Sequence, residues 1–336
     1  MQVSDFEHFR DVLLERRQNL TEWLNSASMA HTGDAEKVHR LLEQIKEALD
    51  RVKSATYGEC KVCHEGVELH RLEVQPVKQI CLCCISEEEQ AELEEDLYLA
   101  SKIHRALLPQ TTPKIEGFEV EVRSLAASNI GGDYYDFLPD TDSQTFRVII
   151  ADAMGHGLPA GLLMSNLQGA MRILSSDINE PGPLIARLNQ WLCRNVPVTK
   201  FVSLVCLDIE KTSAKETRVT YTNAGHCQPV LIRKDGSVER LEVTGGVLGV
   251  DEEFTYDEQR VSLFSGDILV LYTDGIIEAE NAQGELYGED RLVEFIRAQQ
   301  KDSFQNVVDG LLNSVFEFSG TSQAADDLTV LMLHKK

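Results

Sequence analysis

The chain has 336 residues, of which 43% are hydrophobic and 26% charged, and its formal net charge is −23. This length is enough for about two globular domains, and so negative a chain is not expected to bind a nucleic-acid backbone. No stretch approaches the roughly 18 consecutive apolar residues of a membrane span, and the acidic first residues are unlike a signal peptide, so we expect a cytoplasmic protein that does not bind membranes.

Two helices are expected before residue 57. Apolar residues recur with helical spacing through residues 1–25, and a turn signal at 31–34 precedes a second apolar series with alternating spacings of four and three. The second series is Val38, Leu42, Ile45, Leu49 and Val52. Two helices joined by a short turn predict a coiled-coil-like helical hairpin over residues 1–56.

Five of the eight cysteines lie between residues 60 and 84. Two CxxC pairs separated by 17 residues are typical of a tetrahedral site for one structural Zn²⁺. The expected ligands are Cys60, Cys63, Cys81 and Cys84. Cys83 is left over, and His64 and His70 are alternative ligands. Four protein ligands leave no open position on the metal, so we expect no catalysis there.

The segment YGECKVCHEGVELHRLEVQPVKQICLCC resembles the zinc finger of the DksA/TraR family, and the resemblance covers about residues 5–86. Members of that family carry a coiled coil where this chain has its hairpin, and acidic residues at the coiled-coil tip act on RNA polymerase. The tip here reads SMAHTGDAE, with Asp34 and Glu36 but without the family's paired aspartates. We therefore expect residues 57–86 to form an input or oligomerisation module.

A third helix is predicted from Ser86, an N-cap residue followed by three glutamates, to Pro109. Its apolar stripe is Leu93, Leu97, Ala100, His104 and Leu107. Such a stripe needs a partner, which is either the rest of the chain or the same helix of a second copy. We expect residues 87–109 to form a linker helix, with a homodimer through this helix as one interpretation.

After Pro109 the pattern changes to that of an α+β domain over residues 110–336. Apolar and charged residues alternate over 118–123, and further strands are predicted at 146–151, 201–209, 217–223, 229–233, 267–272 and 328–333. Helices are predicted at 158–174, 183–195, 289–299 and 303–318. Adjacent strands, such as 217–223 and 229–233, favour hairpins.

Aspartates recur beside strand ends and glycine turns. Asp133 follows two glycines, Asp152 and Asp274 follow apolar runs, and Asp326 and Asp327 precede the last predicted strand. Each alone is more typical of an ordinary turn. Together, converging carboxylates would repel one another unless cations lay among them, and oxygen ligands suit Mg²⁺ or Mn²⁺. Two such ions that share a carboxylate are the arrangement used for in-line displacement at phosphorus.

Six motifs, GGDYYDF, ADAMGHGLPAGLLM, NAGHCQPVLI, GGVLGV, LYTDGIIEA and DDLTV, follow one another in this order. Together they resemble the bacterial PPM-type (type-2C) serine/threonine phosphatases of the SpoIIE/RsbU group, over about residues 105–335. The resemblance implies an α/β/β/α sandwich of two antiparallel sheets. It also implies a site for two Mn²⁺ or Mg²⁺ ions at the sandwich edge.

The resemblance also implies the roles of individual residues. Asp152 would bridge both metals, Asp133 would bind one, and Asp274 and Asp326 would bind the other. The carbonyl of Ala153 stands where the family uses a backbone oxygen, and Asp327 is an alternative to Asp326.

Three further residues are auxiliary candidates. Asp136 supports the ligands or the fold, and His226 matches a family motif without an assigned role. His156 is a candidate general acid. However, it lies four residues after Asp152, whereas type-2C phosphatases place their histidine two residues after the aspartate, where this chain has Met154.

The function implied by the resemblance is metal-dependent hydrolysis of phosphoserine or phosphothreonine by an activated water. The implied substrate is a phosphorylated STAS-type anti-sigma-factor antagonist in a partner-switching pathway, and the zinc module would regulate the enzyme. The alternative is an inactive phosphatase domain that regulates transcription machinery through the zinc module. The complete set of aspartates favours the enzyme.

Overall fold

The computed structural model describes residues 3–26, 32–139, 145–197, 199–211, 216–299 and 303–336. The chain divides into two compact units, Met1–Glu95 and Asp96–Lys336. Within the described ranges, no helix is long and apolar enough to cross a membrane.

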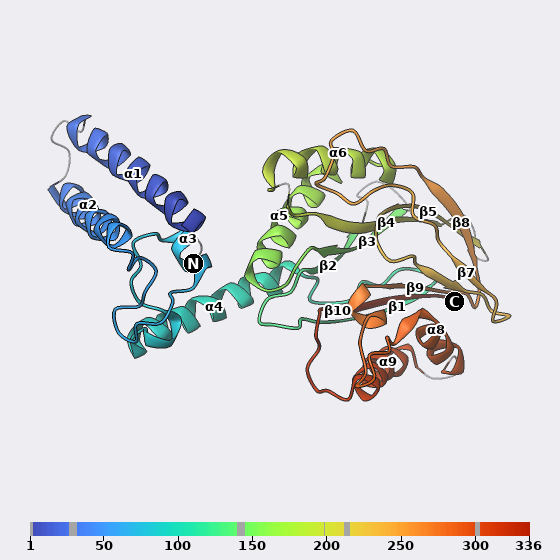
Figure 1. Cartoon of the computed structure of the whole chain (residues 1–336). Coiled ribbons are helices and arrows are strands. Elements are labelled where there is room, and N and C mark those ends of the chain that lie inside the picture. Colours follow the sequence, from blue (N-terminus) through green and yellow to red (C-terminus); the bar gives the residue numbers. More distant parts are fainter. Residues whose placement is uncertain (1–2, 27–31, 140–144, 198, 212–215, 300–302) are drawn as a thin grey trace. The chain divides into compact units, whose positions relative to one another are not determined.

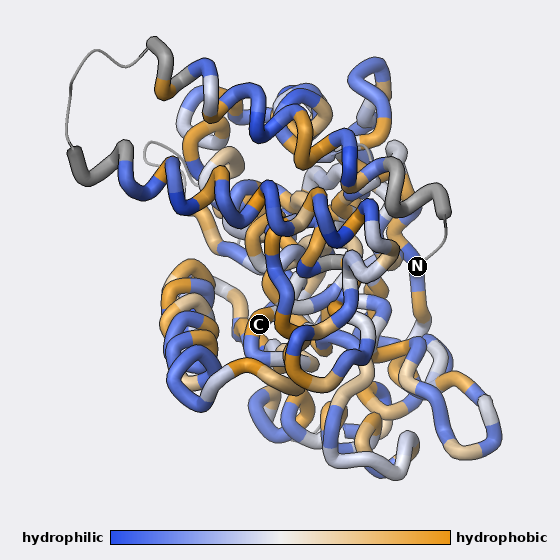
Figure 2. Tube along the Cα trace, turned by 60° about the vertical axis from the view of Figure 1, so that its left-hand side comes forward, coloured by the Kyte–Doolittle hydropathy of each residue, from blue (hydrophilic) through white to orange (hydrophobic). Residues whose placement is uncertain are grey.

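The first unit contains the expected helical hairpin. Helices α1 (Val3–Ser26) and α2 (Thr32–Lys53) lie side by side, and hydrophobic residues recur along both largely hydrophilic helices (Figure 2). Phe9 and Leu13 of α1 and Ile45 and Leu49 of α2 are buried in one cluster. Ile45, Leu49 and Val52 of the predicted apolar series therefore pack against α1 and the cysteine segment, which includes α3 (Leu69–Val74) and the short 3₁₀-helix η1 (Leu82–Cys84).

Helix α4 (Glu87–Leu107) begins in the first unit and ends in the second. The hydroxyl of Ser86 accepts the N–H of Glu89 at 3.1 Å, which confirms the predicted N-cap. Ser101 and His104 are buried, and the His104 ring lies against Gly161. Tyr98, Leu99 and Ile103 are exposed on the same segment of the helix.

The second unit is built on two five-stranded antiparallel sheets, layered face to face (Figure 1). In spatial order the first sheet contains β1 (Phe118–Leu125), β10 (Leu328–Lys335), β9 (Ile268–Tyr272), β6 (Val230–Ile232) and β7 (Val238–Arg240). The second contains β2 (Asp133–Pro139), β3 (Thr145–Ala153), β4 (Val202–Lys211), β5 (Glu216–Ala224) and β8 (Gln259–Phe264).

Helices cover the outer face of each sheet, which confirms the α/β/β/α sandwich. Helices α5 (Leu158–Leu174) and α6 (Pro181–Asn195) cover the second sheet, and α8 (Gly288–Ala298) and α9 (Phe304–Ser319) cover the first (Figure 1). The short helix α7 (Asp274–Ile277) follows β9.

Strand β3 shows how the sheet positions Asp152. Val148 and Ile150 pack between the sheets, whereas Ile149 and Ala151 pack under α5 and α6. Burial on both faces explains the unbroken apolar run in the sequence. Because side chains alternate along a strand, Asp152 belongs to the face between the sheets, at the strand end.

One predicted strand pair is wrong. Strand β5 pairs with β4 and β8, while β6 pairs with β9 and β7, so 217–223 and 229–233 do not form a hairpin. The chain instead crosses between the sheets after β5, where Gly225 has a φ of 68°. The connection between β5 and β6 is as short as a hairpin loop. The spacing of the two strands in the sequence therefore did not show that they belong to different sheets.

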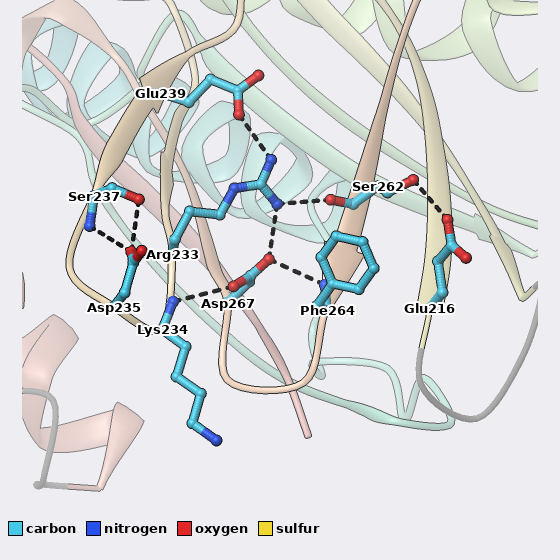
Figure 3. A network of polar contacts seen from close by, with 9 residues as sticks. All are labelled: Glu216, Arg233, Lys234, Asp235, Ser237, Glu239, Ser262, Phe264 and Asp267. Carbon is cyan, nitrogen blue, oxygen red and sulfur yellow. Dashed lines mark hydrogen bonds and ion pairs between the residues drawn. The ribbon is translucent and has the colours of Figure 1, made fainter.

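A polar network holds the two sheets together at another edge (Figure 3). The guanidinium of Arg233, next to β6, donates to Asp267 at 2.8 Å, to the Ser262 carbonyl at 2.7 Å and to Glu239 at 2.7 Å. Buried Asp267 also accepts the N–H of Phe264 at 3.0 Å. Since β8 and β6 belong to different sheets, these bonds fix the sheets relative to each other.

Candidate active site and cysteine cluster

Side chains from both sheets meet at the strand ends that follow Asp152. Asp133, Asp152 and Ser203 lie opposite one another on β2, β3 and β4 and face the space between the sheets. From the other sheet, the hydroxyls of Thr273 and Thr329 both donate to Oδ2 of Asp133, at 2.8 and 2.6 Å. Asp133 is therefore buried and held in one orientation by a residue of β10 and by the residue that directly follows β9.

The acids of this region crowd one another, and we call Asp133, Asp152, Asp274, Asp326 and Glu278 the acid cluster. Burial raises the pKa of Asp152 to about 7, together with the negative charges of four other acids: Asp274, Asp326, Asp327 and Glu278. Burial, with Glu278 and Asp326, also raises the pKa of Asp274. Carboxylates in this arrangement require protons or cations to offset their repulsion.

Burial, with the charge of Asp152, raises the pKa of Asp133 well above its ordinary value. The cluster thus has the donor set that a hard divalent cation prefers, and it has an excess of negative charge that such a cation would neutralise. Among the described residues, however, no three acids of the cluster have carboxylate oxygen atoms that all lie within 4.8 Å of one another. The donor chemistry and the charge of the cluster fit divalent cations.

The structure separates Asp326 from its neighbour Asp327. Asp327 is buried, and its carboxylate accepts the N–H groups of Ala127 (2.7 Å) and Gly132, so it holds the 127–132 loop. Asp326 is exposed and accepts the N–H of Asp327 at 2.8 Å. Of the two, Asp326 is the one whose carboxylate is accessible to a ligand.

Two glycines let the loop before β2 approach the DAMGHG turn. A Cβ on Gly132 would lie 2.8 Å from the carbonyl oxygen of Ala153, and one on Gly131 would lie 2.9 Å from Oδ2 of Asp327. The N–H of Ala153 donates to the Gly132 carbonyl at 3.2 Å. The GGD sequence is therefore required by close packing around the Ala153 carbonyl, as well as by the turn.

The auxiliary candidates have different positions. Asp136 faces the opposite side of the sheet, where it accepts the hydroxyl of Tyr134 and the guanidinium of Arg172, both at 2.8 Å, and so supports the packing of α5. His156 is exposed in the turn before α5. His226 is buried, with Nδ1 2.7 Å from the hydroxyl oxygen of Ser203.

Three residues near the cluster were missed by the sequence analysis. Glu278 lies four residues after Asp274 in TDGIIE, one helical turn along, and this spacing was its available signal. Thr273 directly precedes Asp274, and Thr329 lies two residues after Asp327. Their role depends on the pairing of β9 with β10, which one sequence does not define.

In the first unit, the four predicted cysteines lie together. The sulfur atoms of Cys60, Cys63, Cys81 and Cys84 lie within 4.8 Å of one another, and those of Cys63 and Cys81 are 3.5 Å apart. Backbone N–H groups lower the pKa of Cys60 to about 6, whereas the neighbouring thiols raise the pKa of Cys84 to about 12. Cys83 and His64 are exposed, and the side chain of His70 lies outside the described residues. The arrangement suits a tetrahedral Zn²⁺ ion.

Comparison with known proteins agrees with this geometry. The family model described as Stage II sporulation protein E (SpoIIE) matches residues 142–336. The chain is 29% identical over 249 residues to the phosphoserine phosphatase RsbU of Bacillus subtilis (strain 168), covering 74% of this chain and 72% of RsbU. It is 27% identical over 192 residues to the phosphoserine phosphatase RsbP of the same organism, covering 55% of this chain and 46% of RsbP.

Two solved structures share the fold. The SiaA-PP2C domain of Pseudomonas aeruginosa has a TM-score of 0.63 at 19% identity and covers 74% of this chain and 99% of that domain. The RsbU and RsbW domains of a Mycobacterium tuberculosis protein give a TM-score of 0.56 at 24% identity, covering 68% of this chain and 63% of that one. Fold, acid cluster and relatives together define a protein serine/threonine phosphatase with the PP2C fold. The chain belongs to the SpoIIE family.

Proposed function

We propose that this phosphatase binds two Mn²⁺ or Mg²⁺ ions in the acid cluster and hydrolyses phosphoserine or phosphothreonine in a partner protein. The observation that carries the proposal is the pairing of Asp133 with Asp152 at the strand ends, with Asp133 buried under two threonine hydroxyls and further acids raising the pKa of Asp152. When bound, the cations would supply an activated water and neutralise charge on the phosphoryl group. The chain's own carboxylates hold them, and the threonines of the opposite sheet keep Asp133 oriented.

The proposed ligand assignment follows the geometry. Asp152 pairs with Asp133 across β2 and β3, and the charges of Asp274 and Asp326 raise its pKa, which supports the proposal that two ions share it. Asp133 serves one ion, and Asp274 and Asp326 serve the other. The Ala153 carbonyl, packed against Gly132, supplies a backbone oxygen. Glu278 is an additional acid beside Asp274.

The proposed substrate is a phosphorylated STAS-type anti-sigma-factor antagonist in a partner-switching pathway. Support comes from the similarity to RsbU and RsbP, each of which is named a phosphoserine phosphatase. The test is release of inorganic phosphate from such a protein, phosphorylated on serine, compared with an unrelated phosphoserine protein. Equal rates for the two substrates would contradict this specificity.

The first unit is proposed to be a regulatory module with one structural Zn²⁺ held by the four clustered cysteines, similar to a DksA/TraR zinc finger. Helix α4 is proposed to connect it to the phosphatase domain and to form a homodimer, because Tyr98, Leu99 and Ile103 expose apolar surface on this helix. Sedimentation equilibrium tests the dimer: a monomer at all concentrations would contradict it.

The enzymatic proposal is tested with a small aryl phosphate and Mn²⁺. Asp152→Asn should lower the rate by at least about a hundredfold, the loss expected when a central electrostatic group is removed from a reaction centre. Asp177→Asn, which changes an exposed aspartate after α5, is the matched control and should retain the wild-type rate. Equal rates for Asp152→Asn and wild type would contradict the site.

A further inference from the structure

The NAGH segment, residues 223–226, lies near the acid cluster, and no role was assigned to its histidine from the sequence. The side chain of Asn223 accepts the N–H of His226 at 2.8 Å and donates to its carbonyl at 3.2 Å. Gly225 has a φ of 68°, and a Cβ there would lie 2.5 Å from Cγ1 of Val247. Asn223 and Gly225 thus fix the backbone of His226.

The ring of His226 contacts the row of strand-end side chains. It is 5% exposed, and its Nδ1 lies 2.7 Å from Oγ of Ser203. Ser203 lies directly opposite Asp152 in the pairing of β3 with β4. Side chains at directly opposite positions of an antiparallel pair have Cβ atoms about 4.5–5.5 Å apart. A bond to the histidine therefore controls the hydroxyl that lies next to Asp152.

The protonation of the ring decides which way that hydroxyl points. Burial lowers the pKa of His226 to about 4, so the ring is neutral at ordinary pH and has one N–H and one acceptor nitrogen. The Tyr272 backbone opposes this lowering by favouring a proton on the ring. Nε2 is buried and lacks a hydrogen-bond partner of regular geometry among the described residues.

With the ring proton on Nε2, Nδ1 is the acceptor in its 2.7 Å contact with the Ser203 hydroxyl. The Ser203 hydroxyl then donates to His226, and its oxygen lone pairs remain for the side of Asp152. A serine without this partner would instead be free to donate its proton to a carboxylate of the cluster, where it would compete with cations.

We propose that His226 is a positioning residue, which turns the Ser203 proton away from the acid cluster so that Ser203 presents an oxygen acceptor beside Asp152. This acceptor receives a hydrogen bond from the attacking water of the reaction, and the inference therefore rests on the proposed hydrolysis. His226 touches neither substrate nor carboxylate and acts only through Ser203.

Two substitutions of His226 separate this role from simple packing. Asparagine places a polar atom where Nδ1 lies, whereas glutamine places one where Nε2 lies. His226→Gln and Ser203→Ala should each lower kcat for an aryl phosphate about ten- to a hundredfold, the usual effect of losing a residue that orients a catalytic group. His226→Asn should retain kcat within about threefold of wild type, and the melting temperature should be recorded for every variant.

The double variant is the decisive measurement. If His226 acts through Ser203, adding His226→Gln to Ser203→Ala lowers kcat no further, because residues that work as a unit are not additive. His334→Gln, which alters a half-buried histidine stacked on Phe304, controls for unspecific effects and should leave kcat unchanged.

Three outcomes would overturn the positioning role: equal losses for His226→Asn and His226→Gln, multiplicative losses in the double variant, or a lower melting temperature with unchanged kcat. Failure of the enzymatic proposal looks different. In that case wild type releases no phosphate, or Asp152→Asn is as active as wild type, and both proposals fall. An inactive Asp152→Asn with a fully active His226→Gln removes the positioning role alone.

Discussion

Thr329 donates its hydroxyl proton to Asp133 across the interface of the two sheets, with 2.6 Å between the oxygen atoms. The carboxylate is buried, and Thr273 donates to the same oxygen, so the first sheet sets the orientation of a ligand that belongs to the second. The acid cluster therefore depends on the sandwich as a whole and not on one loop.

Thr329→Val should consequently weaken both the fold and the metal site. The variant keeps the side-chain shape but removes the hydroxyl that bonds the buried carboxylate of Asp133 and the Ser124 hydroxyl, at a cost of about 1–3 kcal/mol in the free energy of unfolding. Urea denaturation measures the stability, and Mn²⁺ titration measures the affinity. Thr222→Val, which removes a buried hydroxyl bonded to the Asp257 carbonyl, should lower stability without changing Mn²⁺ affinity. Unchanged affinity in Thr329→Val would contradict the support of Asp133.

The contribution of Asp152 to the stability of the metal-free protein should fall as the pH rises from about 4 to about 7. A carboxyl whose pKa is raised in the folded state favours folding below its unfolded pKa of about 3.9, and this contribution is lost as the pH rises through the folded value. For Asp152 the folded pKa is about 7.

Thermal denaturation of wild type and Asp152→Asn at several pH values reports this contribution together with the effect of the Asp152 charge on the pKa of Asp133, which the substitution also removes. The melting temperature of wild type should fall relative to that of Asp152→Asn over this range, and saturating Mn²⁺ should remove the fall. A constant difference between the two proteins from pH 4 to 7 would show that Asp152 is not perturbed.

Gly132→Ala should inactivate the site through the backbone. The added Cβ would lie 2.8 Å from the carbonyl oxygen of Ala153, and a backbone atom cannot move aside as a flexible side chain does. Activity and Mn²⁺ affinity should both fall at least about tenfold. Gly169→Ala is the matched control, because a Cβ there meets nothing within 4 Å. It should be neutral or more stable by up to about 1 kcal/mol, the helix propensity difference between the two residues. A Gly132→Ala protein with normal affinity would refute the packing argument.

Cys60→Ser should abolish zinc binding. The Cys60 sulfur is buried and accepts N–H groups of Val62 and Cys81, both at 3.4 Å, which favours its thiolate form. Metal analysis of the purified chain should give one zinc per wild-type chain and none in the variant. Cys83→Ser, at an exposed cysteine outside the cluster, should retain the full content. Equal zinc content in Cys60→Ser and Cys83→Ser would rule out the assigned ligands.

The sequence predicted β3, β10, α5 and α9 well, since the two strands are unbroken apolar runs and the two helices have strong helical periodicity. It also predicted the four cysteines that come together, because CxxC spacing is a local signal. It did not predict strands β2, β7 and β8. The other features that it missed depend on contacts between distant segments. The pairing of β5 and β6 was wrong because a crossover and a hairpin have similar loop lengths, and the roles of Thr329 and Ser203 follow from strand register.

The aspartates illustrate the same limit. Their positions at strand ends predicted an acidic site, but the different environments of Asp326 and Asp327 became clear only from the hydrogen bonds of Asp327 to the 127–132 loop. His226 matched a family motif, but the contact that its side chain makes is a tertiary one. Its partner, Ser203, lies 23 residues earlier in the chain, on a different strand.

Calorimetric titration of Mn²⁺ into the zinc-loaded chain, followed by assay of phosphate release on the same samples, tests the central claim most directly. Two Mn²⁺ ions should bind per wild-type chain, and Asp152→Asn should lose both this stoichiometry and the release of phosphate. A wild-type chain that binds no Mn²⁺, or an Asp152→Asn chain that binds two ions and releases phosphate at the wild-type rate, would contradict it.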